Sequence, residues 1–214
     1  MVQKITEWTK KVECLTKHAK THLHAAFSAL THGLIGRWVY VMRVSSLTSD
    51  DVFRPMERSL SETLIPVLTG QPTPGASVHS LPALPSRHGG MGILYPTAMR
   101  ADQQAASTAI SAPLVKRIMD QNGDTLQARR AQAVLKQTVR RTRADQMKIT
   151  AENVLSSLKR LERRCALAAQ EKSTTSWLAA LPIQHHGFAL NKGAFWDAIA
   201  LRYGWPLRLT PLNC

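Results

Sequence analysis

The chain has 214 residues, of which 44% are hydrophobic, a share that excludes full disorder and predicts one folded domain or one domain with an extended element. Lysine and arginine number 28 against 14 acidic residues, so the formal charge is +14 and a polyanion is expected as partner, nucleic acid first and anionic membrane second. No apolar run approaches the roughly 18 residues that a bilayer requires, so no membrane span is predicted.

The N-terminus and the cysteines predict an intracellular protein of the nucleus or the cytoplasm. Residues 1–8 lack the basic and then apolar segments of a secretory leader. The three cysteines, Cys14, Cys165 and Cys214, lie far apart and form no CxxC pair. This spacing argues against a disulfide framework and against a complete zinc site.

Residues 1–69 are expected to form a bundle of three amphipathic helices. In each helix the apolar residues recur at steps of three and four, which is the spacing of one helix face. Gly33 and Gly36 would let another helix approach closely, and Pro66 is expected to disturb the end of the third helix. The three apolar faces consist of Val2, Ile5, Trp8, Val12, Leu15 and Ala19, then Leu23, Phe27, Leu30, Leu34, Trp38 and Val41, and then Val52, Met56, Leu60, Leu64 and Val67.

Residues 70–96 are predicted to form a connector rich in proline and glycine. The prolines within 81–85 argue against a regular helix there, because proline lacks an N–H donor and restricts the residue before it. The glycines of 89–92 are not followed by the Lys-Ser/Thr of a phosphate loop. They are expected to form a turn that packs close to the bundle.

Residues 97–172 are predicted to hold short helices and then one long basic helix. Short helices are expected over 96–108 and 111–121, the second with a proline in its first turn. Asn122–Gly123 would end the second helix, and Asp124 would cap a segment that continues to about Gln170 without glycine or proline. A segment of that length is either one extended helix or two helices joined by a bend.

Residues 173–214 form the last predicted segment. It contains an apolar anchor at 177–182 that a proline ends, followed by a small C-terminal helix over 192–203. Asn191 is the expected N-cap of that helix, and Gly204 is the expected stop.

The positive charge concentrates between residues 129 and 164, where eleven basic residues and three acidic ones sum to +8. Arginine suits forked contacts with phosphate oxygens, so this stretch is the first candidate for binding nucleic acid. A solvated helix surface that serves only solubility is the alternative reading. The candidate nucleic-acid-binding residues are Arg129, Arg130, Lys136, Arg140, Arg141, Arg143 and Lys148, with Lys4, Lys10 and Lys11 of the first helix as a rival site.

No catalytic residue, bound metal or cofactor is predicted. The HExxH, GxSxG and GxGxxG patterns are absent. Cys14, His18 and His22 would share a helix face but would supply three zinc ligands at best. Asp50 and Asp51 are expected at the start of a helix, where acids interact favourably with the helix dipole.

A series of short phrases runs through nearly the whole chain, at residues 7–8, 24–27, 31–34, 37–40 with Arg43, 55–57, 65–70, 81–85, 89–93 with Pro96, 177–182, 186–188 and 192–205. In order and interval these phrases resemble the region downstream of the catalytic core in reverse transcriptases of eukaryotic mobile elements, the retrotransposons. The resemblance implies a thumb-like N-terminal bundle that grips nucleic acid by its backbone without strong sequence preference, and a missing polymerase core as a partner.

Two departures from that family pattern predict a non-catalytic fragment. The Tyr/Phe-x-Asp-Asp motif that holds the catalytic magnesium ions is absent, since Thr48 stands where the aromatic residue would precede Asp50 and Asp51. The chain also stops at Cys214, which would be the first cysteine of a cluster resembling a zinc knuckle. The competing hypothesis is a structural or interaction module that binds an acidic protein or an anionic membrane surface.

Overall fold

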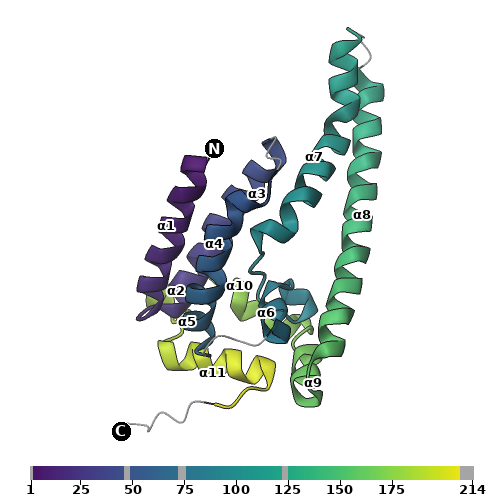
Figure 1. Ribbon diagram of the computed structural model, residues 1–214. Helices are drawn as coiled ribbons and strands as arrows, with labels where there is room; N and C mark the ends of the chain where they lie inside the picture. Colours follow the sequence, from purple (N-terminus) through teal and green to yellow (C-terminus); the bar gives the residue numbers. More distant parts are fainter. Residues whose placement is uncertain (1, 46–48, 72–75, 122–124, 208–214) are drawn as a thin grey trace.

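The computed structural model describes residues 2–45, 49–71, 76–121 and 125–207 of the chain. Within these ranges the regular structure is helical throughout and contains no strand, so the predicted all-α class is confirmed. Figure 1 shows a body of packed helices from which one long helical hairpin projects. None of the helices in the described ranges combines the length and the apolar character that crossing a bilayer requires.

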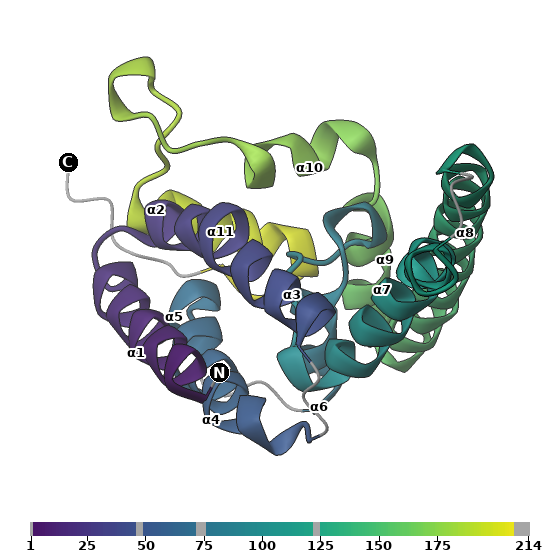
Figure 2. The ribbon, with the colours of Figure 1, turned by 90° about the horizontal axis from the view of Figure 1, so that it is seen from above.

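The N-terminal bundle consists of three helical segments that follow one another along the chain. The first is one regular helix, whereas the second and third each contain a wider, π-helical turn. Figure 2 shows the three segments gathered at one end of the molecule. Their elements are α1 (Val2–Ala19); α2 (Leu23–Ser28), η1 (Ala29–Leu34) and α3 (Ile35–Val44); and η2 (Asp51–Phe53), α4 (Arg54–Ser59), η3 (Leu60–Leu64) and α5 (Ile65–Thr69).

The predicted apolar faces form the core of this bundle. Most of their residues are buried, and Leu15, Val52 and Val67 are partly buried and pack against the core. Val2 is the exception, since 63% of its surface is exposed at the free N-terminal end of α1. The close helix approach expected at Gly33 and Gly36 is wrong, because a Cβ added at either glycine would meet nothing within 4 Å.

The proline in the third helical segment acts as predicted, but the helix continues past it. Pro66 has no N–H for the carbonyl of Glu62, and the π-helical turn of η3 lies directly before it. The segment then runs on to Thr69. It ends at Gly70, whose φ of +68° is the left-handed conformation typical of a helix stop.

The connector contains a helix, although the prolines within 81–85 argue against a regular helix there. α6 (Ala76–Ala83) includes Pro82, which lies in the last turn and therefore removes only one hydrogen bond from the helix. The carbonyl of Pro82 instead accepts hydrogen bonds from the N–H groups of Met91 and Ile93, at 3.2 and 3.0 Å. The short 3₁₀ turn η4 (Ser86–His88) lies in the loop between Pro82 and Met91 that these hydrogen bonds close.

The glycine turn after η4 is tightly packed, as predicted, although its neighbour is a later helix. A Cβ on Gly89, whose φ is +87°, would lie 2.6 Å from the carbonyl oxygen of Ala166. A Cβ on Gly90 would lie 1.9 Å from the carbonyl oxygen of Leu84. Only glycine therefore fits at these two positions without moving the backbone.

The projecting hairpin consists of α7 (Pro96–Met119) and α8 (Thr125–Ser157), which lie side by side in opposite directions (Figure 1). The two short helices predicted over 96–121 are one helix, so that expectation is wrong. Pro113 sits inside α7, and the Ser111 hydroxyl donates to the carbonyl of Thr108 at 3.2 Å instead of starting a new helix. α7 packs along α8. The predicted caps at 122–124 lie outside the described residues.

The last part of the long basic segment is a separate helix, so the alternative of two helices joined by a bend is confirmed. The bend lies at Leu158 and Lys159, and α9 (Arg160–Ala168) follows it. The main-chain N–H of Lys159 donates to the Glu162 carboxylate at 3.2 Å, so Glu162 stabilises the start of α9.

The C-terminal segment packs beneath the bundle, where Figure 1 shows α11 crossing its lower end. The predicted cap and stop of the last helix are confirmed, because Asn191 Oδ1 accepts from the Ala194 N–H at 2.8 Å and Gly204 has a φ of +67°. The indole N–H of Trp196 donates to the carbonyl of Val67 at 3.0 Å. The elements are α10 (Lys172–Ala179), η5 (Gln184–His186) and α11 (Lys192–Tyr203).

A buried histidine links this segment to the bundle. His24 Nδ1 accepts from the main-chain N–H of Leu190, and its Nε2 lies 3.2 Å from the carbonyl of Ala180, so Nε2 carries the proton of the neutral ring. The ring also lies against Phe195, with centroids 5.8 Å apart. Burial lowers the pKa of His24, while the hydrogen bond to Ala180 acts in the opposite direction.

One hydrophobic cluster unites residues from all four segments of the sequence, among them Leu30, Leu84, Leu155 and Phe195. Arg202 of the last segment is hydrogen-bonded to the connector. The residue is 7% exposed, and its guanidinium donates to the carbonyls of Ser86 and Gly90, each at 3.1 Å, and of Thr174 at 3.4 Å. The four predicted segments therefore differ in sequence character, but they contribute to one common hydrophobic core.

Candidate nucleic-acid interface

The exposed cations of α8 form two adjacent stripes along the projecting hairpin. Residues 129, 136 and 140 are spaced by seven and four, and residues 130, 141 and 148 by eleven and seven, so each set stays on one face of the helix. At 1.5 Å per residue the stripes extend for about 28 Å. We name this surface the α8 basic face, and it comprises Arg129, Arg130, Lys136, Arg140, Arg141 and Lys148, all exposed.

The cations of the α8 basic face have no acidic partner among the described residues. The ion pairs Arg54–Asp51, Arg58–Glu62 and Arg100–Asp50 all lie in other parts of the fold. A guanidinium or ammonium group without a partner keeps its full charge available for a phosphate.

Arg143, the remaining candidate on α8, is already engaged inside the protein. Its Nη2 donates to the main-chain carbonyl of Asp102 at 2.7 Å, and its Nη1 donates to Gln103 Oε1 at 3.3 Å. Arg43 of α3 donates from Nε to the same Gln103 oxygen at 2.8 Å. Burial and the neighbouring charge of Arg43 lower the pKa of Arg143. Arg143 therefore joins α8 to α7 and α3, and its guanidinium is not offered to a ligand.

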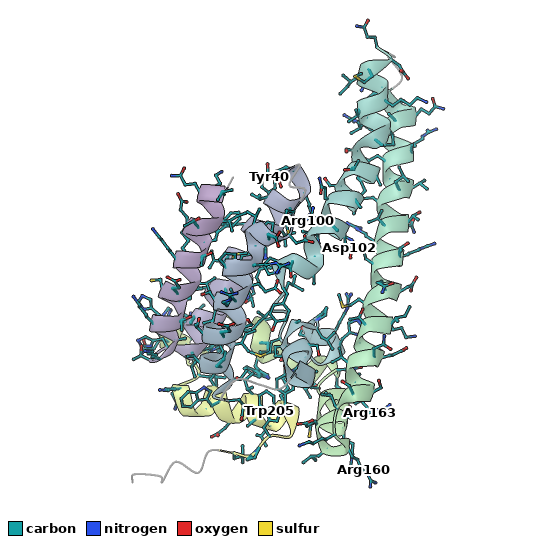
Figure 3. The ribbon with its side chains drawn as sticks, viewed as in Figure 1. Tyr40, Arg100, Asp102, Arg160, Arg163 and Trp205 are labelled. Atoms are coloured by element: carbon teal, nitrogen blue, oxygen red, sulfur yellow. The ribbon has the colours of Figure 1, made fainter. Side chains whose placement is uncertain are left out.

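The basic surface continues beyond the bend. Arg160, Arg163 and Arg164 of α9 are exposed, and Figure 3 shows Arg160 and Arg163 pointing away from the body at the end of the hairpin opposite its tip. Both ends of the hairpin thus carry cations.

The rival lysines of the first helix divide into two groups. Lys4 and Lys11 lie seven residues apart on one face of α1 and line a groove of about 500 Å³ together with Arg37 and Tyr40 of α3. Lys10 is exposed on a different face and does not line the groove. The sequence reading missed Arg37 and Tyr40. Their spacing from Gly33 and Gly36, which places all four on one face, was the signal that could have identified them.

The adjacent acids Asp50 and Asp51 stand at the start of a helical segment, as expected, and each pairs with an arginine. Asp50 accepts a short hydrogen bond from Arg100 of α7, labelled in Figure 3, and Asp51 Oδ1 lies 2.6 Å from Arg54 Nε. In the described ranges no group of three or more His, Cys, Asp or Glu side chains is placed to hold a metal ion.

Comparison with protein-family models, with curated proteins and with solved structures gave no match. A function for the chain has to be argued from its own charges and contacts.

Proposed function

We propose that this chain binds the sugar–phosphate backbone of nucleic acid through the α8 basic face, without strong sequence preference and without catalysis of its own. The resemblance to the post-catalytic region of retrotransposon reverse transcriptases supports the same proposal. On that reading the polymerase core of the element is a further partner, and the nucleus or the cytoplasm is the place of action.

The observation that carries the proposal is the row of cations on a projecting helix that form no ion pair with any described acid. The row extends for about 28 Å, whereas the phosphates of one DNA strand follow each other at about 3.4 Å along the helix axis. Five simultaneous phosphate contacts therefore fit within its length. Phosphate contacts carry no sequence information, so affinity without selectivity is expected.

The experiment is a salt titration of binding to two fluorescent 20-base-pair duplexes of unrelated sequence, followed by anisotropy. With five phosphates contacted, the slope of log K against log salt is expected to be about −4 to −5 for both duplexes. The variant Arg130→Gln, Arg141→Gln, Lys148→Gln removes one stripe and is expected to reduce the slope by about 3.

The matched control removes three charges from a different surface, through Lys10→Gln and Lys17→Gln on α1 and Lys20→Gln in the turn directly after it. This variant has the same net charge and is expected to keep a slope close to that of the parent. Equal behaviour of the two variants would show that total charge, rather than the α8 basic face, sets affinity. Absence of binding by the parent would overturn the proposed function itself.

A second candidate function, an interaction module, is favoured by the tip of the hairpin. Ile118 and Met119 are 71% and 78% exposed, and the exposed Leu126 lies close by along the chain. Apolar side chains beside basic residues are typical of a surface that meets an anionic membrane. Co-sedimentation with phosphatidylserine vesicles, lost in Ile118→Ser with Met119→Ser and kept in the α8 stripe variant, would favour this function over the first.

A further inference from the structure

A groove between α1 and α3 has the composition of a binding site for a single nucleotide. Lys4, Glu7, Trp8 and Lys11 line one wall, and Arg37, Tyr40 and Val41 line the other. Its volume of about 500 Å³ lies within the range of small-molecule sites. Tyr40, labelled near the upper end of α3 in Figure 3, is 65% exposed, so much of its ring is free of protein contacts.

The backbone explains why this groove exists. α1 packs mainly on α4, α2 and η3, whereas α3 continues from η1 and packs mainly on α7, so α1 and α3 diverge above the π-helical turn. Gly33 and Gly36 lie on the α3 wall without a side chain to fill the space. π-helical turns inside longer helices are frequent at functional sites, and η1 lies at this groove.

The charges of the groove favour an anionic ligand. Lys4, Lys11 and Arg37 are exposed and form no ion pair with any described acid, and Glu7 is the single acidic residue on the walls. The walls therefore sum to +2. The cations come from two different helices, so they can approach one phosphate from both sides.

We propose that this groove binds one nucleotide of a single-stranded nucleic acid, with the base stacked on Tyr40 and the adjoining phosphates held by Lys4, Lys11 and Arg37. The proposal rests on the proposed function, because it adds a single-strand site to a protein whose α8 basic face contacts the backbone. Aromatic stacking and a positive groove are the two features that single-strand binding proteins combine.

A single strand fits the groove better than the other polyanions do. A paired base inside a duplex has both of its faces covered by its neighbours, so it cannot stack on Tyr40, whereas an unpaired base can. An acidic peptide would satisfy the cations but would gain little from the exposed aromatic ring. Acidic peptide binding is therefore the competing outcome of the test.

The test uses the full chain, a fluorescent oligo(dT) 12-mer and a 12-base-pair duplex, with anisotropy as the readout. Tyr40→Ala removes the stacking face, and Tyr40→Phe keeps it. Gly36→Leu fills the groove from its glycine wall and replaces a poor helix former by a good one, so the fold is kept. Thermal unfolding of each variant checks that it is folded.

The expected result is a loss of oligo(dT) affinity of about 5- to 150-fold in Tyr40→Ala, which is the range of base–aromatic stacking. A loss of similar size is expected in Gly36→Leu, and Tyr40→Phe is expected to bind within about two-fold of the parent. Duplex binding should stay unchanged in all three variants, because it depends on the α8 basic face.

Three outcomes would overturn the groove proposal. The first is parental oligo(dT) affinity in folded Tyr40→Ala and Gly36→Leu. The second is equal loss of single-strand and duplex binding in these variants. The third is displacement of oligo(dT) by poly-glutamate with equal potency in the parent and in Tyr40→Ala, which would assign the groove to acidic peptides. The proposed function fails separately, when the parent chain does not bind the duplex.

Discussion

Arg143 of α8 donates a 2.7 Å hydrogen bond to the main-chain carbonyl of Asp102 on α7, so an arginine of the basic stretch holds the hairpin together instead of facing solvent. Figure 3 shows Asp102 on the side of α7 that faces α8. The same guanidinium reaches Gln103, which also receives Arg43 from α3. Three helices meet at this one side-chain oxygen.

The variant Arg143→Gln should therefore affect stability more than binding. A glutamine is too short to keep both contacts, and the loss of hydrogen bonds from a charged donor is expected to lower the free energy of unfolding by about 1–3 kcal/mol. Urea denaturation measures this change. Arg141→Gln, exposed on the same helix, is the control and should stay within about 0.5 kcal/mol of the parent while its affinity for duplex DNA falls. A reversed pattern would place Arg143 in the interface.

Stability should fall as the pH drops below about 6.5, in part because of His24. The pKa of His24 is lowered in the folded protein, so the unfolded chain, with an ordinary value of 6.5, binds the proton first. The stabilisation is thus complete above 6.5 and is lost as the pH falls toward the folded value. Protonation of Nδ1 also removes the acceptor for the Leu190 N–H.

The check is the urea midpoint at pH 7.5 and at pH 5.0. His24→Gln should be less stable than the parent at pH 7.5 and should lose less stability between the two values. His88, whose pKa is also lowered by burial and by Arg87, stays in both proteins, so the difference isolates His24. An identical fall in both proteins would contradict the prediction.

Two glycines should respond to alanine in opposite directions. Gly90→Ala places a methyl group 1.9 Å from the carbonyl oxygen of Leu84, so the loop must move, and a loss of at least about 2 kcal/mol is expected. Gly36→Ala meets open space within a helix and should add about 0.5–1 kcal/mol. Thermal unfolding of the two variants measures both changes in stability. Destabilisation by Gly36→Ala would show that there is no open space for a methyl group at this position.

The chain is expected to show no template-directed nucleotide incorporation with magnesium or manganese. Polymerisation requires carboxylates that hold two metal ions, whereas Asp50 and Asp51 are each paired with an arginine. Primer extension with purified protein on RNA and DNA templates measures the activity. Incorporation that Asp50→Asn or Asp51→Asn abolishes, in a variant that remains folded, would contradict this expectation.

Local patterns in the sequence are sufficient to predict which helix faces are buried and where some helices end. The step of three and four correctly placed Phe27, Trp38 and Leu60 in the core, because one helix face has to bury its apolar residues. Asn191 and Gly204 were identified as helix ends because capping depends only on neighbouring residues.

Features that depend on distant parts of the chain could not be predicted in this way. Pro113 was expected to begin a helix, yet contact with α8 carries α7 through it. Arg143 lies on the side of α8 that meets α7, whereas Arg141 is exposed, and the sequence does not show which side that is. The groove at Tyr40 exists because α3 packs on α7 and turns away from α1, a relationship that no local spacing encodes.

The hairpin of α7 and α8 has a mechanical consequence. Near the body, α8 is fixed by Ala151, Val154 and Leu155, all buried, whereas farther out only Ala128 among its described residues is buried. Local opening costs less where fewer apolar contacts must be broken. Amide hydrogens should therefore exchange slowly at the root of the hairpin and progressively faster toward its tip. The outer half can bend to follow a curved or irregular polyanion while the body keeps its shape.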